Sequence, residues 1–287
     1  MRNRTIGFRS RRSRLSDRDL DFVIDIAAPE FKDKTKLKCL IEEDDDFRKG
    51  IVGDENVFRR VAADDEVILR ISPTLYFEVL LRKAHRELQK VTYTMERAGS
   101  EAIPVWDARK VVELLEEEAV LGYLADMLSS FTKIENWALT VKGKKGAWRK
   151  LRFNDMDIDS LITFCNAVDE AHRFSFYKRI GDLCLFLLGM FPECTCFGSW
   201  YPPPGDQRLK AALAFGRTVE EYEEQGKRFY ALAGAHEDAN ALELSETLWL
   251  LHDNFSVVRK PLNFICEQYV HHSKHSLFGL DLHPRGN

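Results

Sequence analysis

The sequence lacks the short motifs that mark common catalytic and nucleotide-binding sites. It contains no GxxxxGK[ST] phosphate loop, no GxGxxG turn after a strand, no GxSxG nucleophile elbow and no HExxH helix. No repeat of fixed period is present either. The enzyme classes that these motifs define are therefore not indicated, and the sequence predicts no cofactor.

Long hydrophobic runs are also missing. The longest apolar run, residues 183–191, is far shorter than the roughly 20 residues that a membrane-spanning helix needs. The N-terminus has no apolar segment of the kind found in secretory signals, and only its content of arginine and serine resembles a transit peptide. We therefore expect neither a membrane protein nor a secreted one.

The cysteines do not form the framework of a small disulfide-rich domain. Three of them stand in apolar helical segments, where a free cysteine behaves as a small hydrophobic residue. Their usage predicts a reducing, cytoplasmic location. The six are Cys39, Cys165, Cys184, Cys194, Cys196 and Cys266.

What the chain does contain is the composition of a globular protein. Its 287 residues are long enough for one large core or two ordinary domains. Hydrophobic residues make up 45% and charged residues 31%, which indicates neither disorder nor a membrane protein.

The formal net charge of −4 hides an uneven distribution. Residues 1–18 hold seven arginines against Asp17 alone, a charge of +6, so the rest of the chain carries −10. An arginine-rich arm on an acidic body either binds a nucleic acid or another acidic partner, or folds back on its own surface. Composition leaves both alternatives open.

Apolar residues recur at helical spacing through most of the chain, which predicts a mainly α fold: a helical bundle with one β-hairpin at about residues 137–153. Ser16 and Ser72, the latter followed by Pro73, are the clearest helix starts. The expected helices are residues 16–28, 34–43, 55–62, 72–94, 107–131, 159–193, 219–233, 242–252 and 257–270, with a loop at 99–104 and either a strand or a helical turn at 66–71.

We expect four parts along the chain. They are a basic arm at residues 1–15, an N-terminal helical part at 16–156 that ends in the hairpin, a C-terminal helical bundle at 157–270 and a tail at 271–287. In the helix after Thr218, Gly226 is expected to let a neighbouring helix approach closely.

The predicted hairpin is strongly basic. Six cations occur in eleven residues with no acid among them: Lys142, Lys144, Lys145, Arg149, Lys150 and Arg152. Such a hairpin can neutralise phosphates, together with Arg9, Arg11, Arg12 and Arg14 of the arm. The alternative is a solvated hairpin whose lysines keep an exposed strand edge soluble.

A second candidate site lies within the apolar segment 159–193, where five polar residues stand at helical spacing: Asp169, His172, Arg173, Arg179 and Asp182. On one continuous helix, Asp169 would meet Arg173, and Arg179 would meet Asp182. A buried carboxylate beside a histidine suits proton transfer, whereas ion pairs of this kind more often fix how helices pack.

The sequence predicts no metal site. Cys194 and Cys196 have no second cysteine pair, and His271, His272 and His275 stand in the expected tail. The pairs His236–Glu237 and His252–Asp253 lack the Glu-x-x-His spacing of di-iron bundles.

One resemblance concerns about the last 120 residues. The segment YKRIGDLCLFLLGMFPE at 177–193, followed by Tyr222-x3-Gly226-x3-Tyr230, resembles a pattern in uncharacterised helical proteins of bacteria. The resemblance implies a helical fold and a bacterial source, and it implies no activity.

From the sequence we expect a non-enzymatic interaction protein that contacts nucleic acid or another acidic partner through the arm and the hairpin. The alternative is a metal- or carboxylate-dependent enzyme with its site between helices. The sequence predicts neither the identity of a partner nor the oligomeric state.

Overall fold

The computed structural model describes residues 15–64, 66–98, 101–132, 136–142, 148–154, 156–193 and 217–278. The arginine-rich arm lies outside these residues. Within them the protein is mainly helical, as predicted, and its strands form two separate two-stranded antiparallel hairpins. No helix among the described residues is long and apolar enough to cross a membrane.

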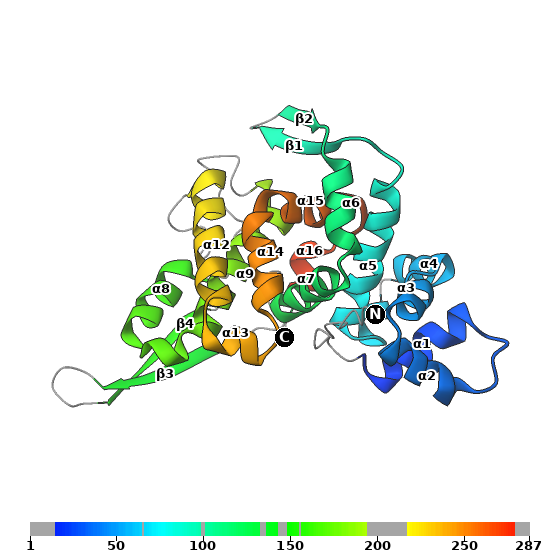
Figure 1. The fold of residues 1–287 in the computed structure, drawn as a ribbon, viewed down its shortest axis with the longest axis horizontal. Helices are drawn as coiled ribbons and strands as arrows, with labels where there is room; N and C mark the ends of the chain where they lie inside the picture. Colours follow the sequence, from blue (N-terminus) through cyan, green and yellow to red (C-terminus); the bar gives the residue numbers. More distant parts are fainter. Residues whose placement is uncertain are drawn as a thin grey trace, which may run out of the picture.

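The N-terminal helices form one end of an elongated molecule (Figure 1). They are α1 (Asp17–Ala27), α2 (Lys34–Glu43), α3 (Asp45–Val52) and α4 (Glu55–Ala63), followed by the 3-10 turn η1 (Val67–Leu69). The predicted helices 16–28, 34–43 and 55–62 are thus confirmed, and residues 66–71 contain a helical turn rather than a strand. Helix α3 was not predicted.

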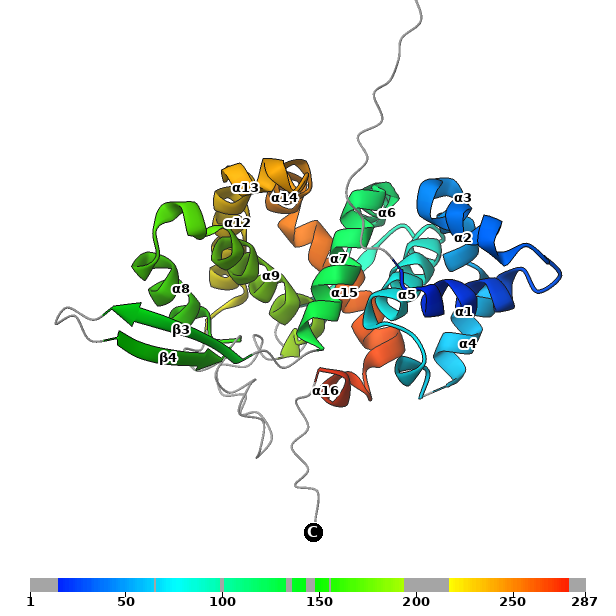
Figure 2. The ribbon, with the colours of Figure 1, turned by 90° about the horizontal axis from the view of Figure 1, so that it is seen from below.

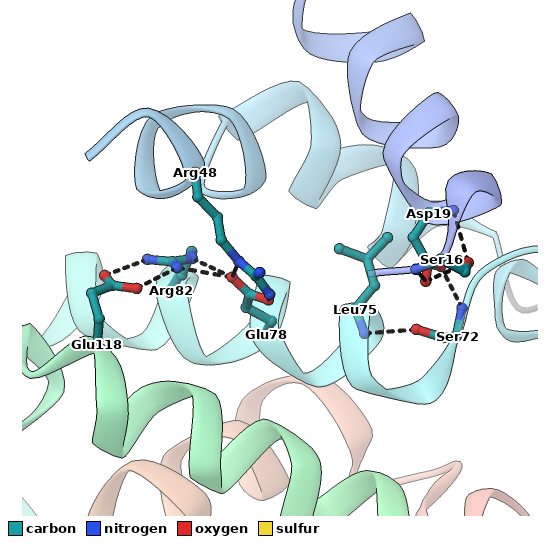
Figure 3. Close-up of polar contacts among 8 residues, drawn as sticks. All are labelled: Ser16, Asp19, Arg48, Ser72, Leu75, Glu78, Arg82 and Glu118. Atoms are coloured by element: carbon teal, nitrogen blue, oxygen red, sulfur yellow. Dashed lines mark hydrogen bonds and ion pairs between the residues drawn. The ribbon is translucent and has the colours of Figure 1, made fainter. Parts of the chain in front are cut away.

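Two serine caps fix where α1 and the next helix begin. Ser16 and Asp19 form a reciprocal capping box at the start of α1, and Ser72 accepts the backbone N–H of Leu75. Asp19 is fully buried, and its Oδ1 also accepts the backbone N–H of Ser72 at 2.7 Å (Figure 3). One carboxylate therefore joins the beginnings of α1 and α5 (Pro73–Leu88).

Helix α5 divides the hydrophobic interior into two cores. Leu75 and Val79 pack with α1–α4 in the smaller core. Phe77, Leu80 and Leu81, from the same helix, pack in the larger core that runs to Phe278. The expected boundary near residue 156 does not coincide with this division, which falls within α5.

The middle of the chain contains a hairpin around the position where the sequence predicts a loop. Strands β1 (Thr94–Ala98) and β2 (Glu101–Val105) pair in the register Thr94↔Val105 and Ala98↔Glu101. The sequence signal was the Gly99-Ser100 pair alone, because the strands TMERA and EAIPV are rich in alanine and glutamate, which are depleted in strands. Pro104, which lacks an N–H group, made β2 read as a loop.

The predicted single helix 107–131 is two helices, α6 (Ala108–Glu116) and α7 (Glu118–Phe131). Glu117 between them has an extended backbone with ψ 101°. The carboxylate of Glu118, the first residue of α7, accepts hydrogen bonds from Arg82 on α5. A contact between distant parts of the chain thus accompanies the break.

The segment 159–193 is also broken. It contains α8 (Ile158–Ala167), the 3-10 turn η2 (Glu170–His172) and α9 (Phe174–Met190). Val168 is extended, and its carbonyl accepts a hydrogen bond from Arg173 Nε at 2.8 Å. Helix α9 is buried on nearly all sides, as expected for the centre of the larger core.

The last helices are α12 (Val219–Gly234), α13 (Glu237–Ala241), α14 (Ser245–Asp253) and α15 (Phe255–Ile265), followed by the π-helical turn η3 (Cys266–Val270) and α16 (Lys274–Leu277). Two of them, α12 and α15, pack against α9. Lys274 and Phe278 are buried, so the segment expected to be a tail packs on the core as far as residue 278.

The close approach expected at Gly226 is present. A Cβ atom there would lie 2.3 Å from the ring of Phe255 and 3.1 Å from Cys184 Cβ. We predict that Gly226→Ala lowers the free energy of unfolding by about 1–3 kcal/mol, because the α12, α9 and α15 contacts must spread. Urea denaturation measures this change.

The control is Gly122→Ala in α7, where nothing lies within 4 Å of the added methyl group. That variant should be neutral or more stable by about 0.4–1 kcal/mol, since alanine restricts the unfolded chain. Equal effects at the two positions would show that helix propensity, rather than close packing, explains Gly226.

Candidate functional site

The basic hairpin forms as predicted. Strands β3 (Asn136–Lys142) and β4 (Trp148–Asn154) pair in the register Asn136↔Asn154 and Lys142↔Trp148. Figures 1 and 2 show the hairpin extending beyond α8 at the end of the molecule opposite α1–α4. A pair of strands that reaches past the helices can meet a partner with little hindrance from the body of the protein.

Only part of the predicted basic surface falls within the described residues. The register places Val141 opposite Arg149, Thr140 opposite Lys150 and Ala138 opposite Arg152. Lys144 and Lys145, together with Arg9, Arg11, Arg12 and Arg14 of the arm, lie outside the described residues. The side chains of β3 and β4 lie outside them as well, so partner binding by these cations stays a prediction.

The polar cluster predicted on one helix does not assemble as expected. Because the helix breaks at Val168, Asp169 and His172 lie in and beside η2 and are exposed. Arg173 donates to the carbonyl of Val168 rather than to Asp169. The physical reason is that the predicted spacing brings these side chains together only on an uninterrupted helix.

Arg179 and Asp182 stay on α9 but have different partners from those predicted. Arg179 donates to Ser130 Oγ at 2.9 Å, and its guanidinium carbon lies 3.7 Å from the ring centre of Phe131. Asp182 instead binds residues of three helices, described next. The expected Arg179–Asp182 pair is therefore wrong.

Asp182 is the centre of a buried hydrogen-bond network. The hydroxyls of Tyr123 on α7 and Tyr230 on α12 donate to its Oδ1, at 2.6 and 3.0 Å. Its Oδ2 accepts a hydrogen bond from Lys178 Nζ at 2.7 Å. Gly181 makes room, because a Cβ there would lie 2.8 Å from the Tyr230 ring.

The environment of Asp182 keeps both tyrosines protonated. Burial and then the negative charge of Asp182 raise the pKa of Tyr123 and of Tyr230 well above the usual value near 10. Asp182 is only 2% exposed, and the protein's own helices supply its donors. These hydrogen bonds connect α7, α9 and α12, and the tyrosine hydroxyls keep their protons. The arrangement therefore stabilises the packing of the three helices rather than forming a site for a substrate.

A second buried network, which the sequence reading missed, joins α3, α5 and α7 (Figure 3). Glu78 accepts hydrogen bonds from Arg48 Nε at 2.9 Å and from Arg82 Nη2 at 2.8 Å. Arg82 also forms a bidentate pair with Glu118, at 2.8 and 2.7 Å. The one local signal was the spacing of Glu78 and Arg82 within an apolar stripe.

The pKa of Glu78 reflects these partners. Burial alone would raise it, but the hydrogen bonds and positive charges of Arg48 and Arg82 outweigh that effect and lower it to about 2. Arg82 has a raised pKa because its two carboxylate partners outweigh its own burial. Glu78, Arg48 and Arg82 are thus charged at neutral pH.

A small cavity adjoins this network and has a volume of about 10 Å³. It is lined by Arg48, Thr74, Glu78, Arg82, Glu118, Leu121, Gly122 and Ala125. A space of this size holds about one water molecule, rather than an organic substrate. The network therefore connects the two cores and offers no binding site for a larger ligand.

The structure assembles no metal centre within its described residues, where no group of three or more His, Cys, Asp or Glu side chains is placed to hold an ion. Cys194 and Cys196 lie outside these residues. His275 packs against Phe191, at 5.6 Å between ring centres, and His271 packs against His272.

Comparison of the chain with protein-family models, curated proteins and solved structures finds no match. The predicted resemblance to helical bacterial proteins stays a prediction, and functional inference rests on the chain itself.

Proposed function

We propose that this is a non-enzymatic interaction protein that contacts nucleic acid through its arginine-rich arm and the β3–β4 hairpin. The carrying observation is the position of the hairpin, which projects beyond the helices at one end of the molecule (Figures 1 and 2). Its sequence holds six cations in eleven residues and no acid.

Electrostatics supports the proposal. The rest of the chain is acidic overall, so a nucleic acid is repelled by the body and attracted to the two basic segments. The buried charges of the core, by contrast, are engaged in pairs. Basic residues of this kind favour contacts with phosphates. Such contacts position a protein on a nucleic acid without recognising its base sequence.

We predict that replacing Lys142, Lys144 and Lys145 by alanine weakens binding about equally for all nucleic-acid sequences. Each lost phosphate contact should lower the slope of log affinity against log salt by about 1. Fluorescence anisotropy with labelled mixed-sequence RNA and DNA, at about 50 and 200 mM salt, measures both quantities. Thermal stability should change little.

The matched control replaces three exposed lysines at the N-terminal end of the molecule by alanine: Lys32, between α1 and α2, Lys36 of α2 and Lys49 of α3. It removes the same charge, and it should leave the salt slope unchanged. If the wild type does not bind at low salt, or if both variants lose affinity equally, the hairpin is not a nucleic-acid surface. Binding of polyglutamate without binding of nucleic acid would indicate an acidic protein partner instead.

A further inference from the structure

The other hairpin, β1–β2, carries an unusual concentration of exposed apolar side chains. Half of the large apolar side chains that are strongly exposed in the described part of the chain belong to residues 91–106. They are Val91, Tyr93, Met95, Ile103 and Trp106, and Trp106 is the most exposed at 74%. Single exposed apolar residues are ordinary, whereas a group of them marks an interaction surface.

Three of these residues lie on one face together with Pro104. Met95 pairs with Pro104 in the register, and successive side chains of a strand alternate between faces, so Tyr93 and Trp106 continue the same face. The Tyr93 and Trp106 rings lie 6.2 Å apart between centres. This outer face exposes on the order of 400 Å², since a large aromatic side chain presents about 150–250 Å² when free.

The opposite face of the hairpin is firmly attached. Thr94 donates a hydrogen bond to Asp107 at 2.6 Å, and Glu96 pairs with Lys260 on α15 at 2.7 Å. Lys260, whose side chain is 4% exposed, also pairs with Asp107. These contacts hold the hairpin beside α6 and α15 (Figure 1). The position of its outer face relative to the helices is therefore fixed.

The size of the outer face argues against a second copy of the chain as its occupant. A stable interface between proteins needs about 800 Å² from each side, roughly twice what this face offers. A short segment needs less area when it adds as a strand, because its backbone hydrogen-bonds to the sheet edge. Each strand of this two-stranded sheet has one neighbour, and Pro104 removes a donor from β2, which leaves β1 as the better edge.

The charges that flank the outer face favour an acidic occupant. Lys90 lies in the turn between α5 and β1, and Arg109 and Lys110 lie in the first turn of α6, three and four residues after Trp106. Lys110 is exposed and makes no ion pair with any residue in the described part of the chain. Four acids nearby whose side chains are described have basic partners: Glu87 with Lys83 and Lys90, Glu96 with Lys260, Asp107 with Lys260, and Glu113 with Arg109. Lys90 and Arg109 are thus engaged in these pairs, and Lys110 is the cation that can meet an acidic occupant.

We infer that the outer face of the β1–β2 hairpin docks a short, extended, acidic segment of a partner protein. The segment lies along β1, its apolar side chains contact Tyr93, Met95 and Trp106, and its carboxylates meet Lys110. This surface is separate from the basic β3–β4 hairpin and does not depend on binding of nucleic acid there.

The probes are two synthetic peptide pools of about twelve residues, long enough to exceed the five-residue strand β1. Both alternate Val, Ile or Phe with charged residues, which are Asp and Glu in one pool and Lys in the other. The readout is the indole N–H signal of Trp106 in an NMR titration of the full chain, assigned with Trp106→Phe. The acidic pool should shift this signal, and the basic pool should not.

Trp106→Ala should weaken binding of the acidic pool about tenfold, as expected for an exposed aromatic anchor. Lys110→Glu should weaken it as well, and Met95→Glu provides a second test of the apolar contact. The matched control is Trp249→Phe, a partly exposed tryptophan of α14, which should bind normally.

Four results would overturn the inference. The first is no shift at millimolar peptide, and the second is an equal response to both pools. The third is a shift of the Trp106 signal by mixed RNA oligomers, which would assign the face to nucleic acid. The fourth is dimerisation in analytical ultracentrifugation that Trp106→Ala abolishes, which would assign the face to a second copy.

Discussion

Replacing Glu78 by glutamine is expected to lower the free energy of unfolding by about 3–5 kcal/mol, because it removes one charge from a buried network. Glu78 is 1% exposed and accepts hydrogen bonds from both Arg48 and Arg82. In the variant, Arg48 loses the negative charge of its carboxylate partner, and Arg82 is compensated by Glu118 alone. Urea denaturation at neutral pH measures the change.

The control for this substitution is Glu113→Gln on α6. Glu113 also accepts from an arginine, Arg109, at 2.8 Å, but both side chains are more than half exposed. Exposed pairs contribute little, so the control should cost less than about 1 kcal/mol. A cost that small for Glu78→Gln would mean that water reaches the network and screens it.

The pH dependence of stability gives a second readout of the same group. The folded pKa of Glu78 is lowered from its ordinary 4.5 to about 2, so its contribution is fully present above pH 4.5 and is lost as pH falls toward 2. Such a shift corresponds to roughly 3 kcal/mol. When the pH falls from about 5.5 to 2, the free energy of unfolding of the wild type should therefore decrease by roughly 3 kcal/mol more than that of the Glu78→Gln variant.

A similarly large loss, roughly 3–5 kcal/mol, is expected for Asp182→Ala. The variant leaves the buried hydroxyls of Tyr123 and Tyr230 without their acceptor, and each unsatisfied group costs about 1–3 kcal/mol. Lys178 also loses its partner. Asp182→Asn should cost less, since the amide oxygen can still accept from both hydroxyls while its NH₂ group faces Lys178.

The control for Asp182→Ala is Asp169→Ala, at the exposed residue that precedes the turn η2. It belongs to the cluster predicted from sequence but should change stability by less than about 0.5 kcal/mol. If Asp182→Asn proves as damaging as Asp182→Ala in the same denaturation measurement, the negative charge outweighs the two hydrogen bonds. A negligible effect of both variants would mean that the hydroxyls find other acceptors.

Sequence patterns predicted the features whose causes are local. The serine caps, the proline after Ser72 and the Lys-Gly-rich turn between Trp-containing strands each act over a few residues, and the starts of α1 and α5 and the β3–β4 hairpin follow from them. Gly226 could also be singled out, because a glycine within an apolar helical stripe indicates close packing.

The partners of the buried polar groups could not be predicted in this way. Asp182 binds tyrosines 59 and 48 residues away, and Arg48 binds a glutamate 30 residues away. Nothing in the spacing of these residues along the chain encodes which helices will meet. The same holds for the break at Glu117, where Glu118 contacts Arg82 on α5.

The position of α5 in both cores decides how this protein can be dissected. A cut before Pro73 would take Leu75 and Val79 away from α1–α4 and open their core to water. A cut after Leu88 would leave Phe77, Leu80 and Leu81 facing solvent on the N-terminal piece and would open a hole in the remainder. The two ends of the molecule are therefore not modules that a gene fusion could exchange, because a piece without α5 has an open core and a piece with α5 exposes the apolar side chains that packed against the other piece.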